Sequence, residues 1–202
     1  MDNKLIGICG GSGSGKTTLA NGLLSQFGKE ASLISMDDFY LPIEKQLLDE
    51  NQMPNFDLPT AINSKIFLEY LTALKAGKSV LVDQYSFNNP NATPIEIAIH
   101  PSKYIITEGI FLFQEKGVID LLDLMIFVDT KEDLMFDRRI KRDLENRGIP
   151  KETIQYQWKN HFVPAYTKFI YPTIAKADFV IDGNKGFEIE ELGLDIKKAL
   201  SV

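Results

Sequence analysis

The stretch GICGGSGSGKTT, Gly7 to Thr18, decides the fold of this chain. It begins inside the apolar run Leu5 to Cys9, which predicts a buried strand, and it leads into Lys16 to Phe27, whose residues favour a helix. Five of its twelve residues are glycine. Glycine loses more conformational freedom on folding than any other residue, so this density indicates backbone amides that must approach a large anion closely.

Within the stretch, Gly10, Gly15, Lys16 and Thr17 match the pattern GxxxxGK[ST]. In such a loop the amides surround a β-phosphate at the positive end of a helix, the lysine contacts the β- and γ-phosphates, and the hydroxyl binds Mg²⁺. The alternative is a flexible loop that matches by chance, but the strand before it and the helix after it favour phosphate binding. We therefore predict that ATP and Mg²⁺ bind this phosphate loop. The predicted nucleotide-binding residues here are Gly11, Ser12, Gly13, Ser14, Gly15, Lys16, Thr17 and Thr18.

The composition is that of one soluble globular domain, residues 1–202, with 44% hydrophobic and 25% charged residues. A net charge of −6 and a pI of about 5.0 argue against a nucleic-acid partner held on a broad basic face. One cysteine and two histidines give neither an internal disulfide nor a zinc site. There is no signal peptide or apolar run of about 20 residues, so we expect a cytoplasmic protein without a membrane partner.

Strands alternate with helices along the chain, which predicts a three-layer α/β/α fold of the P-loop NTPase type with a mainly parallel sheet. Strands are expected at 5–9, 33–36, 79–82, 104–107, 124–128 and 179–181. Helices are expected at 16–27, 62–77, 130–146, 152–162, 164–171 and 187–200. Thr130 and Asp133 predict a capping box for the helix at 130–146. Residues 83–101, with the turn NNPNATP, predict a small protruding β-hairpin.

A GTPase is disfavoured, because the nearest string to a base-reading NKxD, Asn184-Lys185-Gly186-Phe187, lacks the final aspartate. A motor ATPase generally needs a larger chain with coupling elements. An enzyme that transfers the γ-phosphoryl group fits this size. It requires an acceptor pocket, a carboxylate near the acceptor hydroxyl and cations around the transferred group.

Seven strings resemble the uridine kinase family, within the wider uridine kinase and phosphoribulokinase group. In order they are GGSGSGKTT, SMDDFY, NFDLPTAIN, IITEGIFLF, FVDT, RRIKRDLENRG and YPTIAKADFVI. They follow the family's order at close to its spacing and span most of the chain. The resemblance implies an ATP- and Mg²⁺-dependent kinase of a small hydroxylated metabolite, and by analogy a homo-oligomer.

By this resemblance Asp37 is the catalytic base, and Glu108 holds Mg²⁺ through water together with Thr17. Both acids follow apolar strands, and the carboxyl ends of parallel strands form the ligand-binding edge of such a sheet. Asp38 is the competing base and Asp83 a weaker one. The alternative for Asp37 is a purely structural role, as an aspartate that caps a turn.

Four arginines crowd residues 138–152, which resemble the family's lid: Arg138, Arg139, Arg142 and Arg147. The resemblance implies that Arg139, Arg142 and Arg147 clamp the triphosphate, with Lys16, Arg139 and Arg142 as catalytic cations. Three acids nearby give the alternative of a solvated helix with internal salt bridges: Asp137, Asp143 and Glu145.

The acceptor site matches the family less closely. The resemblance assigns substrate binding to Phe56, Asp57, Tyr85, Phe87, Arg139 and Gln157. The family's Tyr-Asp-Phe string is Tyr85-Ser86-Phe87 here, its next histidine and arginine are replaced by Asn88-Asn89-Pro90, and an arginine of the lid is Ile149. A site that loses such donors loses selectivity for a pyrimidine.

We therefore predict phosphorylation of uridine or cytidine to the 5′-monophosphate. One alternative is the same reaction on nicotinamide riboside, a sugar or a vitamin. Another is a nucleotide-binding regulatory protein that phosphorylates no acceptor. His100, Trp158 and His161 are assigned to packing or to the surface.

Overall fold

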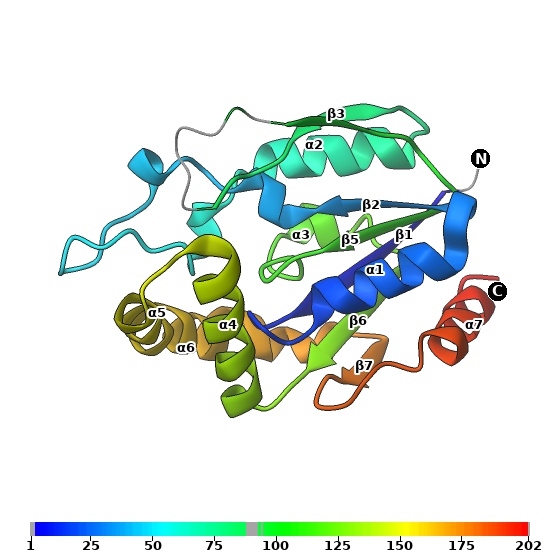
Figure 1. Ribbon diagram of the computed structural model, residues 1–202. Helices are drawn as coiled ribbons and strands as arrows, with labels where there is room; N and C mark the ends of the chain where they lie inside the picture. The colour runs from blue at the N-terminus through cyan, green and yellow to red at the C-terminus, as the bar shows by residue number, and fades with distance from the viewer. Residues whose placement is uncertain (1–2, 88–92, 94, 202) are drawn as a thin grey trace.

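The computed structural model describes residues 3–87, 93 and 95–201 (Figure 1). Five parallel strands form its central sheet in the order β2-β5-β1-β6-β7. Their bounds are β1 Lys4–Gly10, β2 Ala31–Ser35, β5 Tyr104–Glu108, β6 Leu124–Asp129 and β7 Phe179–Asp182. The predicted three-layer α/β fold with a mainly parallel sheet is confirmed.

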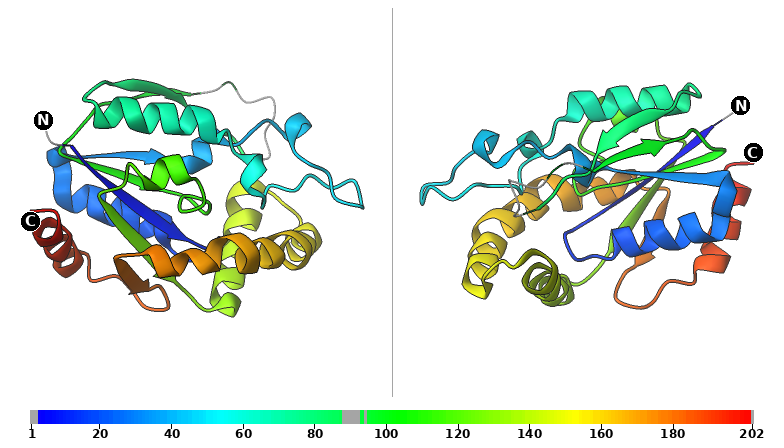
Figure 2. Two further views of the ribbon diagram at one scale, coloured as in Figure 1. Left: turned by 180° about the vertical axis from the view of Figure 1, so that it is seen from behind. Right: turned by 45° about the horizontal axis from the view of Figure 1, so that its top comes forward.

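Helices cover both faces of this sheet (Figure 2). They are α1 Lys16–Phe27, α2 Ser64–Lys75, α3 Lys116–Ile119, α4 Glu132–Arg147, α5 Lys151–Gln157, α6 Val163–Ala165 and α7 Ile189–Ala199. Along β1, Leu5 and Cys9 belong to the core shared with α2 and α3, whereas Ile6 and Ile8 belong to the core shared with α1 and α7. Successive side chains point to opposite faces, so an uninterrupted apolar run is what a strand buried on both faces requires.

A separate two-stranded antiparallel sheet joins β3 Val80–Asp83 to β4 Glu96–Ile99. The hairpin predicted at 83–101 is thus present but starts earlier, because the strand predicted at 79–82 is its first arm. Val80 and Val82 are buried while Leu81 and Asp83 are exposed. This alternation is typical of an antiparallel strand with one solvated face. The predicted turn at Asn88-Asn89-Pro90 lies outside the described residues.

Residues 151–176 form one continuous helical segment, so the break predicted between 162 and 164 is wrong. Wide π-helical turns at Trp158–Phe162 and Tyr166–Ile170 flank α6, and a 3-10 turn, Tyr171–Lys176, ends the segment. Pro164 has no N–H and its ring would crowd the preceding turn of a regular α-helix. A wider turn relieves both problems, so the helix passes through the proline.

The capping box predicted at Thr130 is also wrong, because α4 begins after Lys131 with no side-chain cap. Thr130 Oγ1 instead donates a hydrogen bond of 2.9 Å to the carbonyl of Ser14. The contact joins residues 116 apart in the chain, which no local pattern reveals. It ties the end of β6 to the phosphate loop.

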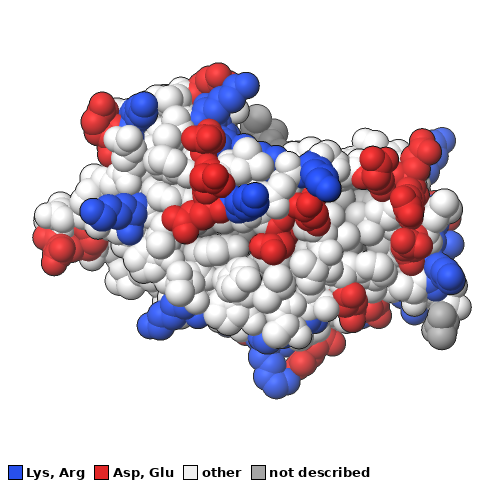
Figure 3. Space-filling model, turned by 90° about the horizontal axis from the view of Figure 1, so that it is seen from below, with Lys and Arg blue, Asp and Glu red and all other residues white. Residues whose placement is uncertain are grey.

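Acidic and basic side chains are interspersed on the face seen in Figure 3, without one broad basic surface there. No helix in the described part of the chain combines the length and the apolar character that crossing a membrane requires.

Candidate active site

The phosphate loop between β1 and α1 is held in place by contacts with a side chain of α4. Gly13 and Gly15 have φ angles of 81° and 102°, in the left-handed region that favours glycine. Arg138 Nη1 lies 3.4 Å from the carbonyl oxygen of Gly13, 3.3 Å from that of Ser14 and 3.0 Å from that of Gly183. With its carbonyls held by α4, the loop keeps one backbone shape, as binding a polyphosphate through amides requires.

Replacing Gly13 with alanine should disrupt this loop. A Cβ there would lie 2.3 Å from the carbonyl oxygen of Met135 in a conformation that L side chains rarely adopt. We expect the free energy of unfolding to fall by about 1–3 kcal/mol, and the affinity for MgATP to fall at least about tenfold. Urea unfolding and calorimetric titration measure the two effects. Gly186→Ala is the control, because its Cβ would meet nothing within 4 Å; equal results for both variants would contradict the prediction.

Glu108 ends β5 beside the phosphate loop and is fully enclosed. Its Oε1 accepts a 2.7 Å hydrogen bond from Ser35, and its Oε2 accepts one of 3.3 Å from Thr17 Oγ1. Burial raises the pKa of Glu108, and the charge of Asp37 raises it further, while Lys16 lowers it. A cation bound by this carboxylate and this hydroxyl would offset the free-energy cost of burying the charged form of the acid. Hard oxygen donors that leave room for phosphate and water suit Mg²⁺.

Asp37 and Asp38 both follow β2 and line one cavity with the phosphate-loop residues Ser12 and Lys16. They differ in their partners. Asp38 Oδ1 accepts a 3.1 Å hydrogen bond from the backbone N–H of Tyr85, which ties it to the chain after β3. Burial raises the pKa of Asp38, and this hydrogen bond opposes the shift. Asp37 is instead held at its backbone, whose N–H donates to Ser35 Oγ at 3.2 Å.

The cavity has a volume of about 810 Å³. All six residues predicted to bind the acceptor line it: Phe56, Asp57, Tyr85, Phe87, Arg139 and Gln157. Asp83 and Ile149 also line it. Of the predicted nucleotide-binding residues, Ser12, Lys16, Arg142 and Arg147 line the cavity, whereas Gly11, Gly13, Ser14, Gly15, Thr17 and Thr18 do not.

An aromatic wall closes one side of this cavity. The ring of Tyr40 lies 5.9 Å from that of Phe56, 5.7 Å from that of Tyr85 and 5.4 Å from that of Phe87, between ring centroids. These distances are those of favourable aromatic contacts. The Arg147 guanidinium lies 3.7 Å from the Phe87 ring centroid, so the wall reaches the end of α4. Such a wall can hold a flat, partly apolar molecule.

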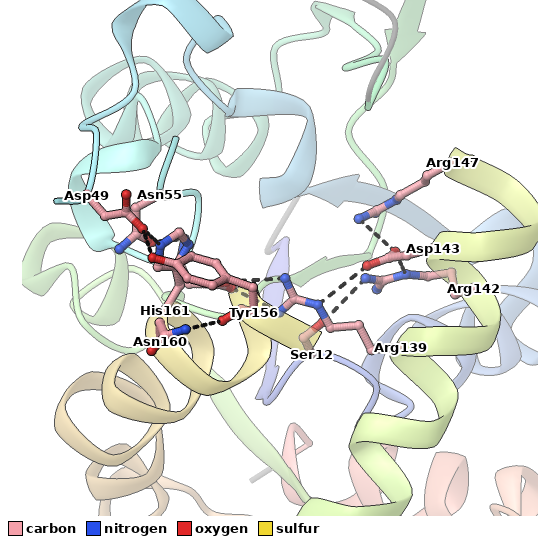
Figure 4. A network of polar contacts seen from close by, with 11 residues as sticks. Ser12, Asp49, Asn55, Arg139, Arg142, Asp143, Arg147, Tyr156, Asn160 and His161 are labelled. Carbon is pink, nitrogen blue, oxygen red and sulfur yellow. Dashed lines mark hydrogen bonds and ion pairs between the residues drawn. The ribbon is translucent and has the colours of Figure 1, made fainter. Parts of the chain in front are cut away.

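Asp143 on α4 contacts three arginines (Figure 4). Its Oδ1 lies 2.8 Å from Arg142 Nε and 3.2 Å from Arg147 Nη1, and its Oδ2 lies 3.4 Å from Arg139 Nε. The aspartate is only 1% exposed. Arg142 Nη2 also lies 3.4 Å from Ser12 Oγ in the phosphate loop. One buried carboxylate therefore contacts all three arginines predicted to clamp the triphosphate. The internal salt bridges of the alternative considered above are thus present, but they centre on a buried aspartate and not on a fully solvated face.

Arg139 and Asp57 form a buried ion pair. Arg139 Nη1 and Nη2 each lie 3.3 Å from an oxygen of Asp57, and both residues are less than a tenth exposed. Burial lowers the pKa of Arg139, but attraction to Asp57 and Asp143 outweighs this and raises it. Two residues predicted to touch different parts of the substrates thus contact each other, joining the loop before α2 to α4.

Three residues that line this cavity had been given no role in it from the sequence: Tyr40, Asp143 and His161. The spacing of Asp143, four residues from both Arg139 and Arg147, was a usable signal for a shared ion pair. Tyr40 is the last residue of the SMDDFY string, but only the two aspartates of that string were assigned roles. His161 is buried, in agreement with its assignment to packing, and it also lines the cavity.

Comparisons with known proteins extend these observations. The sequence pattern of the Phosphoribulokinase / Uridine kinase family matches residues 5–189. Uridine kinase of Borrelia duttonii (strain Ly) is 40% identical over 181 residues, covering 88% of this chain and 85% of that protein. Uridine kinase of Macrococcus caseolyticus (strain JCSC5402) is 34% identical over 201 residues, covering 98% of each.

Two solved structures share the fold. One, titled a possible uridine kinase from Bacillus stearothermophilus, has a TM-score of 0.65 at 21% identity and covers 90% of both chains. Phosphoribulokinase from Rhodobacter spheroides has a TM-score of 0.61 at 16% identity, covering 91% of this chain and 73% of the other. At these identities the likeness concerns the fold alone.

Proposed function

Because this chain belongs to the phosphoribulokinase and uridine kinase family, we propose that it transfers the γ-phosphoryl group of ATP to the 5′-hydroxyl of a pyrimidine nucleoside, uridine or cytidine. The observation that carries the proposal is that Ser12 and Lys16 of the phosphate loop, Asp37 and the aromatic wall line the same cavity. Donor phosphate and acceptor ring thus have a common space. The relatives named uridine kinase support the choice of acceptor.

On the donor side, the amides of the phosphate loop and Lys16 bind the phosphates of ATP. Thr17 and Glu108 would hold Mg²⁺, which supplies positive charge to the phosphate oxygens. Arg142 and Arg147, oriented by Asp143, stabilise the negative charge that spreads over the transferred group. The lid, residues 138–152, closes over the site and excludes water in this proposal.

On the acceptor side, Asp37 accepts the proton of the attacking hydroxyl. Asp57 accepts hydrogen bonds from the sugar with the lone pairs that Arg139 leaves available, and the ion pair keeps its carboxylate in position. Tyr85 and Phe87 pack on the base. Asp37 lies at the end of β2, where a hydroxyl in the cavity and the terminal phosphate of ATP can meet.

A second candidate is the same transfer to another small acceptor, such as nicotinamide riboside, a sugar or a vitamin. The observation that favours it is Ile149, which lines the cavity where the resemblance would place an arginine. An apolar side chain at that position supplies no hydrogen-bond donor to a base, so the pocket discriminates less strongly between rings.

The test is an ADP-release assay of the purified chain with ATP and Mg²⁺ against uridine, cytidine, nicotinamide riboside, sugars and vitamins. We expect uridine or cytidine to stimulate ADP release and to yield the 5′-monophosphate. If only another acceptor stimulates ADP release, the result would support the second candidate, transfer to that acceptor. Nucleotide binding without stimulation by any acceptor would overturn the kinase proposal in favour of a regulatory protein.

A further inference from the structure

Trp158 belongs to a buried group of aromatic rings on the helical segment 151–176. It is 6% exposed, and its ring lies 5.1 Å from that of Phe136 on α4 and 4.3 Å from that of Phe162, between centroids. Phe162 in turn stacks on Tyr166 at 5.5 Å. Trp158, Phe162 and Tyr166 recur every four residues, so they lie on one side of the segment.

The guanidinium of Arg139 lies over two of these rings. Its Cζ is 5.9 Å from the centroid of the Trp158 ring and 5.6 Å from that of the Phe162 ring. A cation within about 6 Å of a ring centroid is attracted to the face of the ring, and tryptophan gives the strongest attraction. Because Arg139 is buried, little water screens this attraction.

The ion pair between Arg139 and Asp57 is longer than such pairs usually are. Both N–O distances are 3.3 Å, whereas the nitrogen and oxygen of a charged hydrogen bond usually approach to about 2.7–2.9 Å. The contact of Arg139 Nε with Asp143, at 3.4 Å, is long as well. The guanidinium is thus held among two acids and two rings, and it is in close contact with neither acid.

We propose that Trp158 is a positioning residue of the acceptor site, whose ring holds the Arg139 guanidinium at this distance from Asp57, so that the carboxylate keeps lone pairs for the hydroxyls of the sugar. Without the ring, the guanidinium moves closer to Asp57 and occupies the oxygens that the sugar needs. Trp158 acts through Arg139, because Gln157 and His161 on the same segment line the cavity and Trp158 is not among the described residues that do. The inference rests on the proposed function and extends it, since the sequence assigned Trp158 only to packing or to the surface.

A role of Trp158 in packing alone makes a different prediction. Phenylalanine and leucine both leave a cavity in place of the indole, but only phenylalanine keeps an aromatic face under the guanidinium. A fluorine on the indole leaves the shape of the ring almost unchanged and withdraws electrons from its face, which weakens the attraction for a cation. Trp158 is the only tryptophan of the chain, so growth on 5-fluorotryptophan changes this residue alone.

The experiment measures KM for uridine and for ATP, together with thermal unfolding, in the wild type, in Trp158→Phe, in Trp158→Leu and in the fluorinated protein. We expect KM for uridine to rise about tenfold in the leucine variant, about threefold in the phenylalanine variant and about twofold in the fluorinated protein. We expect KM for ATP to be unchanged, because Arg142 and Arg147 keep their contacts with Asp143. A packing role instead predicts equal KM for uridine in the two substituted variants, and no difference between the fluorinated protein and the wild type.

Phe27→Leu is the matched control. Phe27 is a buried ring in the core shared with α1 and α7, on the other face of the sheet from the core that contains Trp158. Its substitution should lower the melting temperature through the cavity that it leaves, while KM for uridine changes by less than about twofold.

Equal KM for uridine in Trp158→Phe and Trp158→Leu, or in the fluorinated protein and the wild type, overturns the inference and leaves the proposed function intact. A rise in Phe27→Leu as large as that in Trp158→Leu has the same consequence. If the leucine variant does not fold, the fluorinated protein decides alone, because its indole keeps its shape. Absence of nucleoside-stimulated ADP release in the wild type overturns both the inference and the proposed function.

Discussion

Asp37→Asn should lower kcat for phosphoryl transfer by about 10²–10⁴ while leaving the affinity for ATP nearly unchanged. The substitution keeps the size of the side chain and its backbone contact with Ser35, but the amide cannot accept the proton of the attacking hydroxyl. Because general-base assistance acts only in the transition state, the loss falls on kcat rather than on binding. Steady-state kinetics with the best acceptor of the panel, and calorimetric titration with ATP, measure the two quantities.

Asp38→Asn is the matched control for this experiment. Its amide oxygen can still accept the hydrogen bond from the backbone of Tyr85, so the connection to the chain after β3 is retained. We expect kcat to change by less than about fivefold, within the range of a weakened neutral hydrogen bond. If Asp38→Asn abolishes turnover and Asp37→Asn does not, the assignment of the base is reversed and the neighbouring acid takes the role.

Asp143→Asn should destabilise the folded protein and weaken catalysis together. Removing one partner of a buried ion pair leaves uncompensated charge, which costs about 3 kcal/mol or more. Here one carboxylate contacts Arg139, Arg142 and Arg147, of which Arg139 also keeps its pair with Asp57. We expect the melting temperature to fall by about 6–12 °C for a chain of this size. Because bound phosphates would replace part of the lost negative charge, saturating ATP should recover more stability in this variant than in the wild type.

Differential scanning calorimetry with and without MgATP measures the melting temperature and its recovery by the nucleotide. The value of kcat/KM for ATP measures how much transition-state stabilisation is lost when the arginines are no longer oriented. Asp137→Asn on the same helix is the control, because Asp137 is exposed and its substitution should change the free energy of unfolding by less than about 0.5 kcal/mol. Equal melting temperatures for the two variants would show that the arginines do not depend on the buried carboxylate.

The fold was predictable because its signals are local. The helix predicted from Lys16 to Phe27 is observed with those bounds, and each strand of the central sheet lies within a few residues of its predicted position. Apolar runs, helical spacing and glycines are patterns within a few neighbouring residues, so they can be recognised in a single sequence. The errors arose where tertiary packing overrides a local preference, as at Pro164, which a wide turn accommodates within one helical segment.

The sequence by itself determined the phosphate loop, the alternation of strands and helices, and the acids at the ends of β2 and β5, because each depends on residues adjacent in the chain. Only the tertiary structure decided how those groups are paired. Arg139 meets Asp57 across 82 residues, and His161 meets Asp49 across 112. Charges and ring nitrogens select partners by distance and burial in space, and the order of residues along the chain does not specify either quantity.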